Sequence, residues 1–307
     1  MTTHDGPQST QPTHDGPQPA LVGPLTVIDA HHHVWDLSVR DQGWIAGAGL
    51  APLRRDFSLD DLAPQAQGAG VGATVVVQTV TVAAETPELL DLADAHPLVA
   101  GVVGWTDLTD PAVADALAAL RELPGGDRLV GIRHQVQEEP DPEWLLRPDV
   151  QRGLAAVAAA GLVYDLVVRP RQLLAAAEAA SRQPGLTFVL DHLGKPPIAT
   201  GELEPWAAHL RAFAARPNTV GKLSGLVTEA RWSTWTPAGL RPYTERALEA
   251  FGPGRLMFGS DWPVCLLAAG YRRVITTVRE LTEELTGPER KEIFEAAARR
   301  VYGLRTP

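Results

Sequence analysis

Short runs of apolar, β-branched residues alternate along the chain with longer segments rich in Ala, Leu, Glu and Arg. The runs have the length of strands buried on both faces, and the longer segments have helical spacing. The eight runs lie at residues 25–30, 72–80, 98–105, 128–134, 162–168, 186–192, 219–225 and 255–261. Strands that alternate with helices form a parallel sheet, and eight such units predict a closed (β/α)8 TIM-type barrel of the α/β class.

The helices between these runs are marked by proline in the first turn and by glycine after the last turn. Helices are predicted at residues 111–122, 150–160, 170–182, 205–216, 242–251 and 271–286, with a terminal helix at 288–302 and a long loop at 35–56. A doubly wound sheet is the alternative architecture. That fold carries a glycine-rich first turn for a nucleotide, whereas the first strand here ends in histidines.

The N-terminal segment differs in composition from the rest of the chain. Residues 3–8 and 13–18 repeat the hexapeptide THDGPQ within a stretch rich in Pro, Gly, Gln and Thr. Such a stretch cannot bury enough apolar surface to offset the entropy of ordering it. We therefore predict a disordered, low-complexity tail at residues 1–24 and a single barrel domain at residues 25–307.

Charge and cysteine content narrow the class of protein. The chain has 27 basic and 37 acidic residues, a net charge of −10, which argues against a protein held on nucleic acid by phosphate neutralisation. Cys265 is the single cysteine, which rules out an internal disulfide and is compatible with a reducing cytoplasm. The apolar runs fall far short of the roughly 20 residues that span a bilayer. We expect a cytoplasmic protein without a nucleic-acid or membrane partner, and a homo-oligomer remains open.

Polar and ionisable residues recur where the predicted strands end, which is where a barrel carries its active site. In chain order these ends read Asp29-Ala30-His31-His32-His33, Gln78, Trp105, Arg133-His134, Tyr164-Asp165, Asp191-His192, Ser224 and Ser260-Asp261. Strand ends are in general more polar than strand middles. That tendency alone does not explain why five of the nine histidines fall at these points.

The first and last strands carry the strongest candidates. Alternate residues of an extended strand face the same side, so His31 and His33 are expected to point together into the barrel mouth, with His32 pointing away. Asp261 ends the last strand, which neighbours the first when a barrel closes. We therefore expect these side chains to share one pocket, although the histidines can also be core or surface residues and Asp261 a helix N-cap.

Other strand ends supply weaker candidates. His192 ends the sixth strand and suits hydrogen bonding to a carbonyl or proton transfer near neutral pH, while Asp191 is expected to point outward and anchor a loop. The planar fork of Arg133 suits a carboxylate or hydroxyl-rich ligand, or a salt bridge at the rim. Further candidates for stacking or hydrogen bonding, which packing also explains, are Tyr164, Lys222 and Trp35.

At these residues the chain resembles the amidohydrolase superfamily, over about residues 25–305. Within it, the chain looks like the amidohydrolase-related branch that contains sugar-acid lactonases of the L-fuconolactonase and L-rhamnonolactonase type. The matching motifs are Asp29-Ala-His-His-His-Val-Trp-Asp36, Gly131-Ile-Arg-His134, Tyr164-Asp165, Asp191-His-Leu-Gly-Lys-Pro196, Lys222-Leu-Ser-Gly225 and Phe258-Gly-Ser-Asp-Trp-Pro263. The resemblance implies that the catalytic positions are His31, His33, His192 and Asp261.

The resemblance also bears on metal content. Two-metal members carry a bridging lysine or glutamate at the fourth strand, where this chain has Arg133-His134, so the resemblance argues against a two-metal site. Many one-metal members use a fifth-strand histidine, where this chain has Tyr164-Asp165. The resemblance therefore implies either no required metal or one divalent ion of the zinc type. The residues left to hold that ion are His31, His33 and Asp261, with His192 as a further donor.

By the same resemblance, the expected reaction opens the lactone ring of a sugar acid, an aldonolactone. Asp261 takes a proton from water, the water attacks the ring carbonyl, and Asp261 passes the proton to the leaving ring oxygen. The residues expected to stabilise the oxyanion are His31, His33 and His192, and those expected to orient the substrate are Arg133, Tyr164, Lys222 and Trp35. The alternatives are a metal-dependent decarboxylase of an unsaturated or aromatic carboxylic acid on the same barrel, and a barrel that binds a ligand without turnover.

Overall fold

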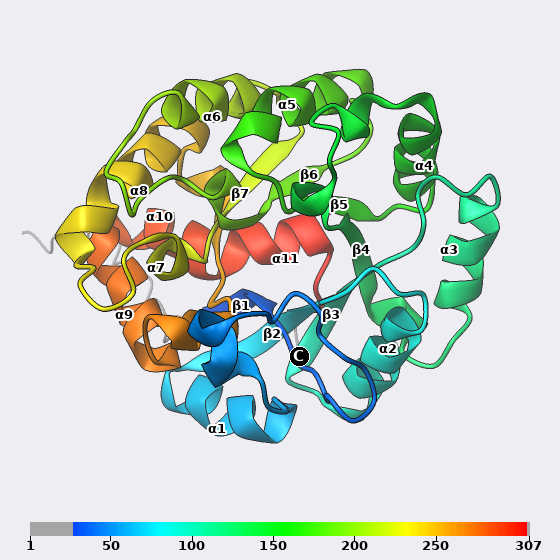
Figure 1. The fold of residues 1–307 in the computed structure, drawn as a ribbon, viewed down its shortest axis with the longest axis horizontal. Coiled ribbons are helices and arrows are strands. Elements are labelled where there is room, and N and C mark those ends of the chain that lie inside the picture. Colours follow the sequence, from blue (N-terminus) through cyan, green and yellow to red (C-terminus); the bar gives the residue numbers. More distant parts are fainter. Residues whose placement is uncertain (1–26, 306–307) are drawn as a thin grey trace, which may run out of the picture.

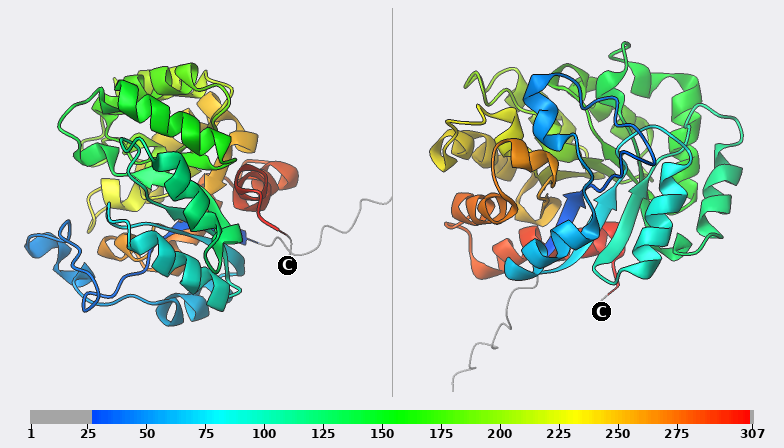
Figure 2. Two further views of the ribbon diagram at one scale, coloured as in Figure 1. Left: turned by 90° about the vertical axis from the view of Figure 1, so that its right-hand side faces the viewer. Right: turned by 60° about the horizontal axis from the view of Figure 1, so that its bottom comes forward.

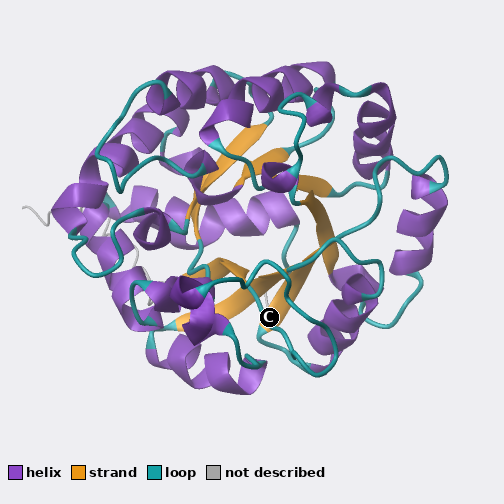
Figure 3. Cartoon of the chain, viewed as in Figure 1, coloured by secondary structure: helices purple, strands orange, loops and turns teal. Residues whose placement is uncertain are grey.

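A computed structural model describes residues 27–305, so the tail predicted at residues 1–24 lies outside the described residues. Eight strands form one sheet in sequence order, and every neighbouring pair is parallel. The strands are β1 (Val27–His32), β2 (Val71–Val77), β3 (Val99–Gly104), β4 (Leu129–His134), β5 (Val163–Leu166), β6 (Phe188–Leu190), β7 (Thr219–Leu223) and β8 (Leu256–Phe258). They occupy the centre of the molecule, with the helices around them (Figures 1 and 3).

The predicted helical segments are all present, with shifts of up to about five residues at their ends, and three further helices, α1, α2 and α7, lie where no segment was predicted. They are α1 (Leu59–Gly68), α2 (Glu85–Ala95), α3 (Val113–Arg121), α4 (Pro148–Ala159), α5 (Leu173–Arg182), α6 (Trp206–Ala214), α7 (Leu226–Glu229), α8 (Pro237–Phe251), α9 (Tyr271–Leu281), α10 (Gly287–Lys291) and α11 (Ala297–Tyr302). A π-helical segment, Glu292–Ala296, joins α10 to α11. Within residues 27–305, these helices are too short or too polar to cross a bilayer.

Contacts between β1 and the end of β8 nearly close the sheet into a barrel. His32 forms a parallel bridge with Trp262. The backbone N–H of His33 donates to the carbonyl of Trp262 (2.6 Å), and that of Asp261 donates to the carbonyl of His31 (2.8 Å). The (β/α)8 prediction is therefore confirmed, and the doubly wound alternative is wrong.

Two apolar layers follow from the alternation of side chains along each strand. One layer packs between strands and helices and contains Leu166 and Phe188. The other fills the inside of the barrel and contains Ile28, Val163 and Val189. Residues of α11 belong to this inner layer, so the terminal helix closes the base of the barrel, on the side away from the loop after β1 (Figure 2).

The loop predicted at residues 35–56 leads across the opposite end of the barrel, the mouth. It contains one 3-10 turn, Ala48–Leu53, and is fastened where Trp35 bridges Phe57. The rings of Trp35 and Phe57 meet edge to face at 5.2 Å, and Phe57 meets Trp262 in the same way at 5.4 Å. This aromatic contact ties the loop to the end of β8, beside the predicted site.

Candidate active site

A cavity of about 270 Å³ opens at the carboxyl ends of the strands. The strand-end residues that line it are His33, Thr79, Arg133, His192 and Asp261. Its rim includes two tryptophans, Trp44 and Trp232, and a lysine–glutamate pair, Lys195 and Glu229, whose charged atoms lie 3.6 Å apart. The cavity therefore combines ionisable groups at its floor with aromatic and charged groups at its entrance.

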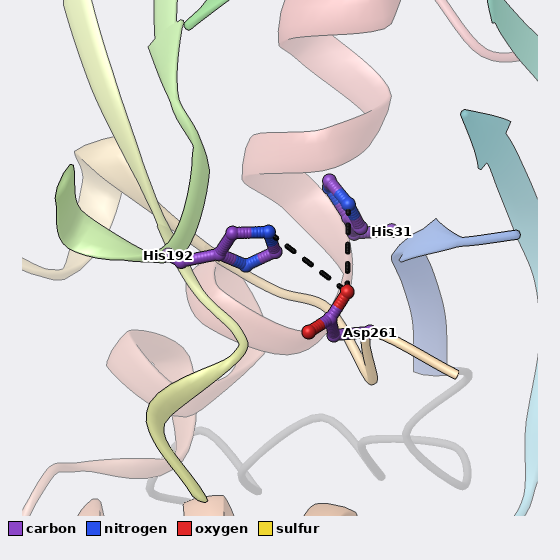
Figure 4. A group of neighbouring side chains, drawn as sticks. All are labelled: His31, His192 and Asp261. Carbon is purple, nitrogen blue, oxygen red and sulfur yellow. Dashed lines mark ion pairs between the residues drawn. The ribbon is translucent and has the colours of Figure 1, made fainter. Parts of the chain in front are cut away.

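One carboxylate and three imidazoles converge at the floor of this cavity: Asp261, His33 and His192 line it, and His31 is fully buried beside them. The Oδ1 atom of Asp261 lies 3.6 Å from Nε2 of His33, and 3.8 Å from Nε2 of both His31 and His192. The Nε2 atoms of His31 and His33 are 3.2 Å apart. Figure 4 shows how His31 and His192 approach Asp261 from different sides. The structure thus brings together all the residues proposed as catalytic.

Unusual backbone conformations direct two of these side chains into the cavity. His192 and Asp261 have φ values of 52° and 57°, in the left-handed region that residues other than glycine rarely adopt. Strand alternation would turn His192 toward the helices, because Val189 faces the barrel interior. The left-handed turn reverses that direction. Gly225 leaves room for the ring, since a Cβ there would lie 2.6 Å from Nδ1 of His192.

Asp29 holds the end of β8 beside β1. Its Oδ1 accepts the backbone N–H of Ser260 (2.8 Å) and that of His31 (3.2 Å), and its Oδ2 accepts the hydroxyl of Tyr271 on α9 (3.0 Å). The side chain is fully buried, and burial raises its pKa to about 6. Asp29 is therefore a structural carboxyl group that positions Asp261 from behind.

Asp191 does not point outward, and the expectation that it anchors a loop is wrong. It is fully buried, with Oδ2 accepting from Nη1 of Arg133 (3.0 Å) and Oδ1 lying 3.0 Å from Nζ of Lys222 and 3.2 Å from Nδ1 of His31. The physical reason is strand alternation: Val189 faces the interior, so the second residue after it does too. Asp191 therefore supports His31 from below the cavity.

Lys222 lies beneath the cavity rather than in it. Its Nζ donates to Oδ2 of Asp165 (2.6 Å) and to Nδ1 of His31 (3.1 Å), and the side chain is fully buried. A substrate in the cavity is therefore separated from this ammonium group by the imidazole of His31. The structure places Lys222 in contact with a catalytic candidate instead of with substrate.

Tyr164 and Trp35 also lie away from the cavity. Tyr164 belongs to the layer between strands and helices, with its ring 6.0 Å from that of Phe188. It faces outward because Val163 and Asp165, its neighbours in β5, face the interior. Trp35 is buried under the loop after β1, where its indole N–H donates to the carbonyl of Arg55 (2.7 Å). Both side chains serve packing.

Arg133 does line the cavity, but most of its donors are engaged. Its Nε and Nη2 donate to Oε1 of Gln78 (3.2 and 2.8 Å), and Nη1 donates to Asp191 (3.0 Å). Gln78 directly follows β2 and holds the guanidinium plane in place. Arg133 therefore presents a fixed positive group at the cavity floor, as part of the same buried network as Asp191.

Hydrogen-bond partners locate a proton on one of these rings. Nδ1 of His33 faces the carbonyl of Val77 (2.7 Å), which only accepts, so Nδ1 carries a proton. Nδ1 of His31 lies 3.1 Å from the ammonium of Lys222, a donor, and 3.2 Å from Oδ1 of Asp191, an acceptor. Its Nε2 lies 3.4 Å from Nη1 of Arg133, a donor, and 3.2 Å from Nε2 of His33. The contacts of His31 therefore accommodate its proton on either nitrogen.

Burial and neighbouring charges give Asp261 and two of the histidines different protonation states at neutral pH. Burial alone would raise the pKa of Asp261, but His192 and His33 outweigh it and hold that pKa below its usual value. Burial lowers the pKa of His192 to about 4 and that of His31 well below its usual range. At neutral pH the site therefore contains an ionised carboxylate facing the neutral imidazoles of His31 and His192, which is the pairing required of a base beside hydrogen-bond donors.

The same residues fit a divalent ion. Ligand atoms of His31, His192 and Asp261 all lie within 4.8 Å of one another. Within the described part of the chain, Oδ1 of Asp191 is buried and has no hydrogen-bond partner, although Nδ1 of His31 lies 3.2 Å away. If the proton of His31 moves to Nδ1, this oxygen accepts it and Nε2 becomes a free ligand, as in many metal-bound histidines.

Sequence reasoning did not single out the residues at the rim of the cavity. Lys195, which has a left-handed φ of 56°, lies within a motif that was noted for the histidine before it. Trp44 belongs to the loop predicted to follow the first strand, and Trp232 lies between α7 and α8. All three residues could have been found from their position in the segments that follow strands, because those segments line the mouth of a barrel.

Comparison with known proteins points to one family. A family model described as amidohydrolase matches residues 28–304. The chain is 42% identical over 291 residues to an L-fucono-1,5-lactonase of Burkholderia multivorans, which covers 91% of this chain and 97% of that protein. A solved structure of a Burkholderia multivorans amidohydrolase with bound zinc is 41% identical, with a TM-score of 0.86, over 91% of this chain and 100% of that one.

Decarboxylases are also among the solved structures with this architecture. A 5-carboxyvanillate decarboxylase of Sphingomonas paucimobilis has a TM-score of 0.62 over 92% of this chain and 100% of that one. Its sequence identity of 16% shows a common fold alone. The similarity to the lactonase is therefore the stronger evidence about function, because the lactonase is similar in sequence along nearly its whole length.

The buried carboxyl group of Asp29 gives a pH-dependent stability that can be measured. The pKa of Asp29 is about 6 in the folded state and about 4 in the unfolded state. Protonation of Asp29 therefore stabilises the folded state, and this stabilisation is lost as pH rises from about 4 to above 6. Asp29→Asn mimics the protonated form at every pH. We expect the free energy of unfolding of the wild type, relative to Asp29→Asn, to fall by about 3 kcal/mol between pH 4 and 7 in urea titrations. A difference that stays constant would contradict a raised pKa.

Proposed function

The chain belongs to the amidohydrolase family, and on that premise we propose that it hydrolyses the ring ester of a sugar-acid lactone, with L-fucono-1,5-lactone as the first candidate substrate. The supporting observation is the carboxylate of Asp261 within 4 Å of three imidazoles at the floor of one cavity. The activity named for the 42% identical relative is of the same kind. The protein is thus an enzyme that acts on a cyclic ester.

The reaction begins with water between Asp261 and the lactone carbonyl. The carboxylate is ionised at neutral pH, because its pKa is held below the usual value. It takes one proton from the water while the water oxygen forms a bond to the carbonyl carbon. The lone pair on Nε2 of His33, 3.6 Å from Asp261, accepts a hydrogen bond from the other water proton and orients the attacking lone pair.

The attack turns the carbonyl oxygen into an oxyanion, which needs donors already in place. His31 supplies one N–H in the tautomer with its proton on Nε2, once the oxyanion takes this donor from Nε2 of His33, 3.2 Å away. His192 supplies a second donor from Nε2 when its Nδ1 accepts the hydroxyl of Ser224, 2.9 Å away. Removing one such donor typically costs about 3–4 kcal/mol of transition-state stabilisation, because it is preorganised in a site that excludes water.

Collapse of the tetrahedral intermediate completes the ring opening. The bond between the former carbonyl carbon and the ring oxygen breaks, and the protonated Asp261 delivers its proton to that oxygen. Lactone and water are thereby converted to one open hydroxy acid, and Asp261 returns to its carboxylate form. One residue acts first as base and then as acid, which requires only a single titrating group at the reaction centre.

The rim supplies contacts for a hydroxylated ring. Trp44 and Trp232 offer apolar faces for the C–H surfaces of a sugar, and Lys195 and Glu229 offer a donor and an acceptor for its hydroxyls. Arg133 faces the same cavity from the floor. Tyr164, Lys222 and Trp35 are left out of this substrate-binding set, because they lie outside the cavity.

A single divalent ion would replace the two N–H donors, because the Nε2 atoms of His31 and His192 that face Asp261 would bind the ion and carry no proton. His31, His192 and Asp261 would hold it, with His33 beside them. When bound, such an ion supplies Lewis-acid polarisation of the carbonyl oxygen. Arg133 occupies the fourth-strand position where a second ion would need a bridging ligand, so we propose one ion and not two.

Neither alternative function has comparable support. The decarboxylase shares the fold at 16% identity, whereas the lactonase shares 42%. A barrel that only binds a ligand has no need for an ionised carboxylate among neutral imidazoles, since burying such groups costs stability. We place the enzyme in the cytoplasm as part of this proposal, since a single cysteine, Cys265, is compatible with a reducing compartment.

Asparagine at position 261 tests the base directly. Asp261→Asn keeps the shape of the side chain but cannot take a proton, so we expect kcat on L-fucono-1,5-lactone to fall at least about a hundredfold. The assay follows acidification of a weakly buffered solution with a pH indicator. Asp115→Asn, an exposed position on α3, is the matched control and should keep wild-type activity. Wild-type turnover by Asp261→Asn would refute the proposed mechanism.

Zinc binding tests the metal site independently of turnover. We expect calorimetric titration of the metal-free protein to give one Zn²⁺ per chain and His192→Gln to weaken binding at least about tenfold, because a ligand is lost. His134→Gln is the control, since His134 pairs with Glu139 (2.7 Å) outside the cluster. Equal affinity of the two variants, or two ions per chain, would contradict the assignment.

A further inference from the structure

The basic groups of the cavity are matched by carboxylates. Among the residues that the structure describes, the lysine and arginine side chains that line the cavity are Arg133 at the floor and Lys195 at the rim. Nη1 of Arg133 donates to Oδ2 of Asp191 (3.0 Å), and Nζ of Lys195 lies 3.6 Å from Oε1 of Glu229. An anionic group that enters the cavity therefore meets no unmatched lysine or arginine.

The pair at the rim is held by the backbone on both sides. Lys195 ends the left-handed stretch that begins at His192, with a φ of 56°. Glu229 ends α7, and its carbonyl accepts the backbone N–H of Ala199 (3.0 Å). This bond ties the loop after β6 to α7, so the ammonium and the carboxylate are kept opposite each other.

The rim pair is partly shielded from water. The side chains of Lys195 and Glu229 are 23% and 27% exposed, so water screens their charges less than those of a surface pair. At 3.6 Å the two charges cancel for a distant anion, but this separation is too long for a hydrogen bond. Both groups therefore keep hydrogen-bonding capacity for uncharged hydroxyls, while Glu229 prevents the ammonium from attracting a carboxylate.

A second carboxylate at the same cavity lacks these properties. Glu138 lines the cavity, and its side chain is 58% exposed, so water screens its charge. Its partner is Arg169, at 3.1 Å, and not a cation that lines the cavity. Glu138 is therefore a matched control for Glu229, since removing its charge uncovers no cation inside the cavity.

We propose that Glu229 is a specificity-determining residue: by neutralising Lys195, it restricts the cavity to hydroxylated lactones without a charged substituent. Lactones that carry a carboxylate are excluded, because the cation that would bind it is already matched. The effect on turnover rests on the proposed lactone hydrolysis. The effect on binding of a carboxylated sugar ring does not depend on turnover.

The first test compares galactaro-1,4-lactone, which carries a carboxylate, with its amide, which has a similar shape and no charge. The measured quantity is kcat/KM for the carboxylate divided by kcat/KM for the amide. In Glu229→Gln we expect this ratio to rise about tenfold, because one unit charge about 7 Å away in a partly screened site changes binding by about that factor. In Glu138→Gln it should stay within about twofold of the wild type. An unchanged ratio in Glu229→Gln, or an equal rise in both variants, would overturn the proposal.

Lys195→Met shows whether the gain comes from an uncovered cation. Added to Glu229→Gln, it should return the ratio to within about twofold of the wild type, because no ammonium then remains to attract the carboxylate. Alone, it leaves Glu229 unmatched and should lower the ratio at least about threefold. A gain that persists in the double variant would contradict the role of Lys195. The Zn²⁺ content is matched among all variants, so an ion at the floor contributes equally to each.

Calorimetric binding of galacturonate separates this inference from the proposed function. The ring of galacturonate bears a carboxylate but contains no ester, so it is not a substrate for hydrolysis. We expect Glu229→Gln to bind it at least about tenfold more tightly than the wild type, and Glu138→Gln to bind it like the wild type. If the wild type opens no lactone, the proposed function fails and this comparison alone decides the inference. Equal affinity of the wild type and Glu229→Gln would overturn it in either case.

Discussion

Two backbone hydrogen bonds, from Asp261 to the carbonyl of His31 and from His33 to the carbonyl of Trp262, join the end of the last strand to the first. They place side chains that are 230 residues apart in sequence around one cavity. Asp29 reinforces the seam by accepting from Ser260 and from His31 at once. Because the carboxylate and imidazoles come from opposite ends of the chain, the site exists only when the barrel closes.

Burial then determines the chemistry that this geometry allows. Burial keeps the imidazoles of His31 and His192 neutral, while His192 and His33 keep Asp261 ionised. Beneath the cavity, the positive groups of Lys222 and Arg133 are matched by the carboxylates of Asp165 and Asp191. These four charges balance one another, so Asp261 is the carboxylate of the cluster that remains to face the substrate. Proton transfer can therefore be confined to one residue.

The barrel was predictable because eight apolar runs of strand length alternate with helices, and the first run ends in histidines instead of the glycine-rich turn of a doubly wound sheet. The meeting of His31, His33 and Asp261 was predictable for the same reason, since closure makes the first and last strands neighbours. The wrong predictions concerned the side of a strand to which a side chain points. Because His192 was expected to face the cavity, strand alternation assigned its neighbour Asp191 to the outer side. The left-handed turn at His192 breaks this alternation, and the sequence pattern does not reveal the turn. Counting from Val163 or Val189 would have placed Asp165 and Asp191 inside and Tyr164 outside. Whether Trp35 faces the cavity depends on loop packing, which no periodicity encodes.

The central claim is that a carboxylate, and not an imidazole, takes the proton from water. The most direct measurement is the pH dependence of kcat/KM for L-fucono-1,5-lactone between pH 6 and 8. With the pKa of Asp261 below its usual value and that of His192 at about 4, neither group titrates in this interval, so we expect kcat/KM to stay level. A rise approaching tenfold per pH unit, with a midpoint near 7, would identify a histidine as the base and contradict the account.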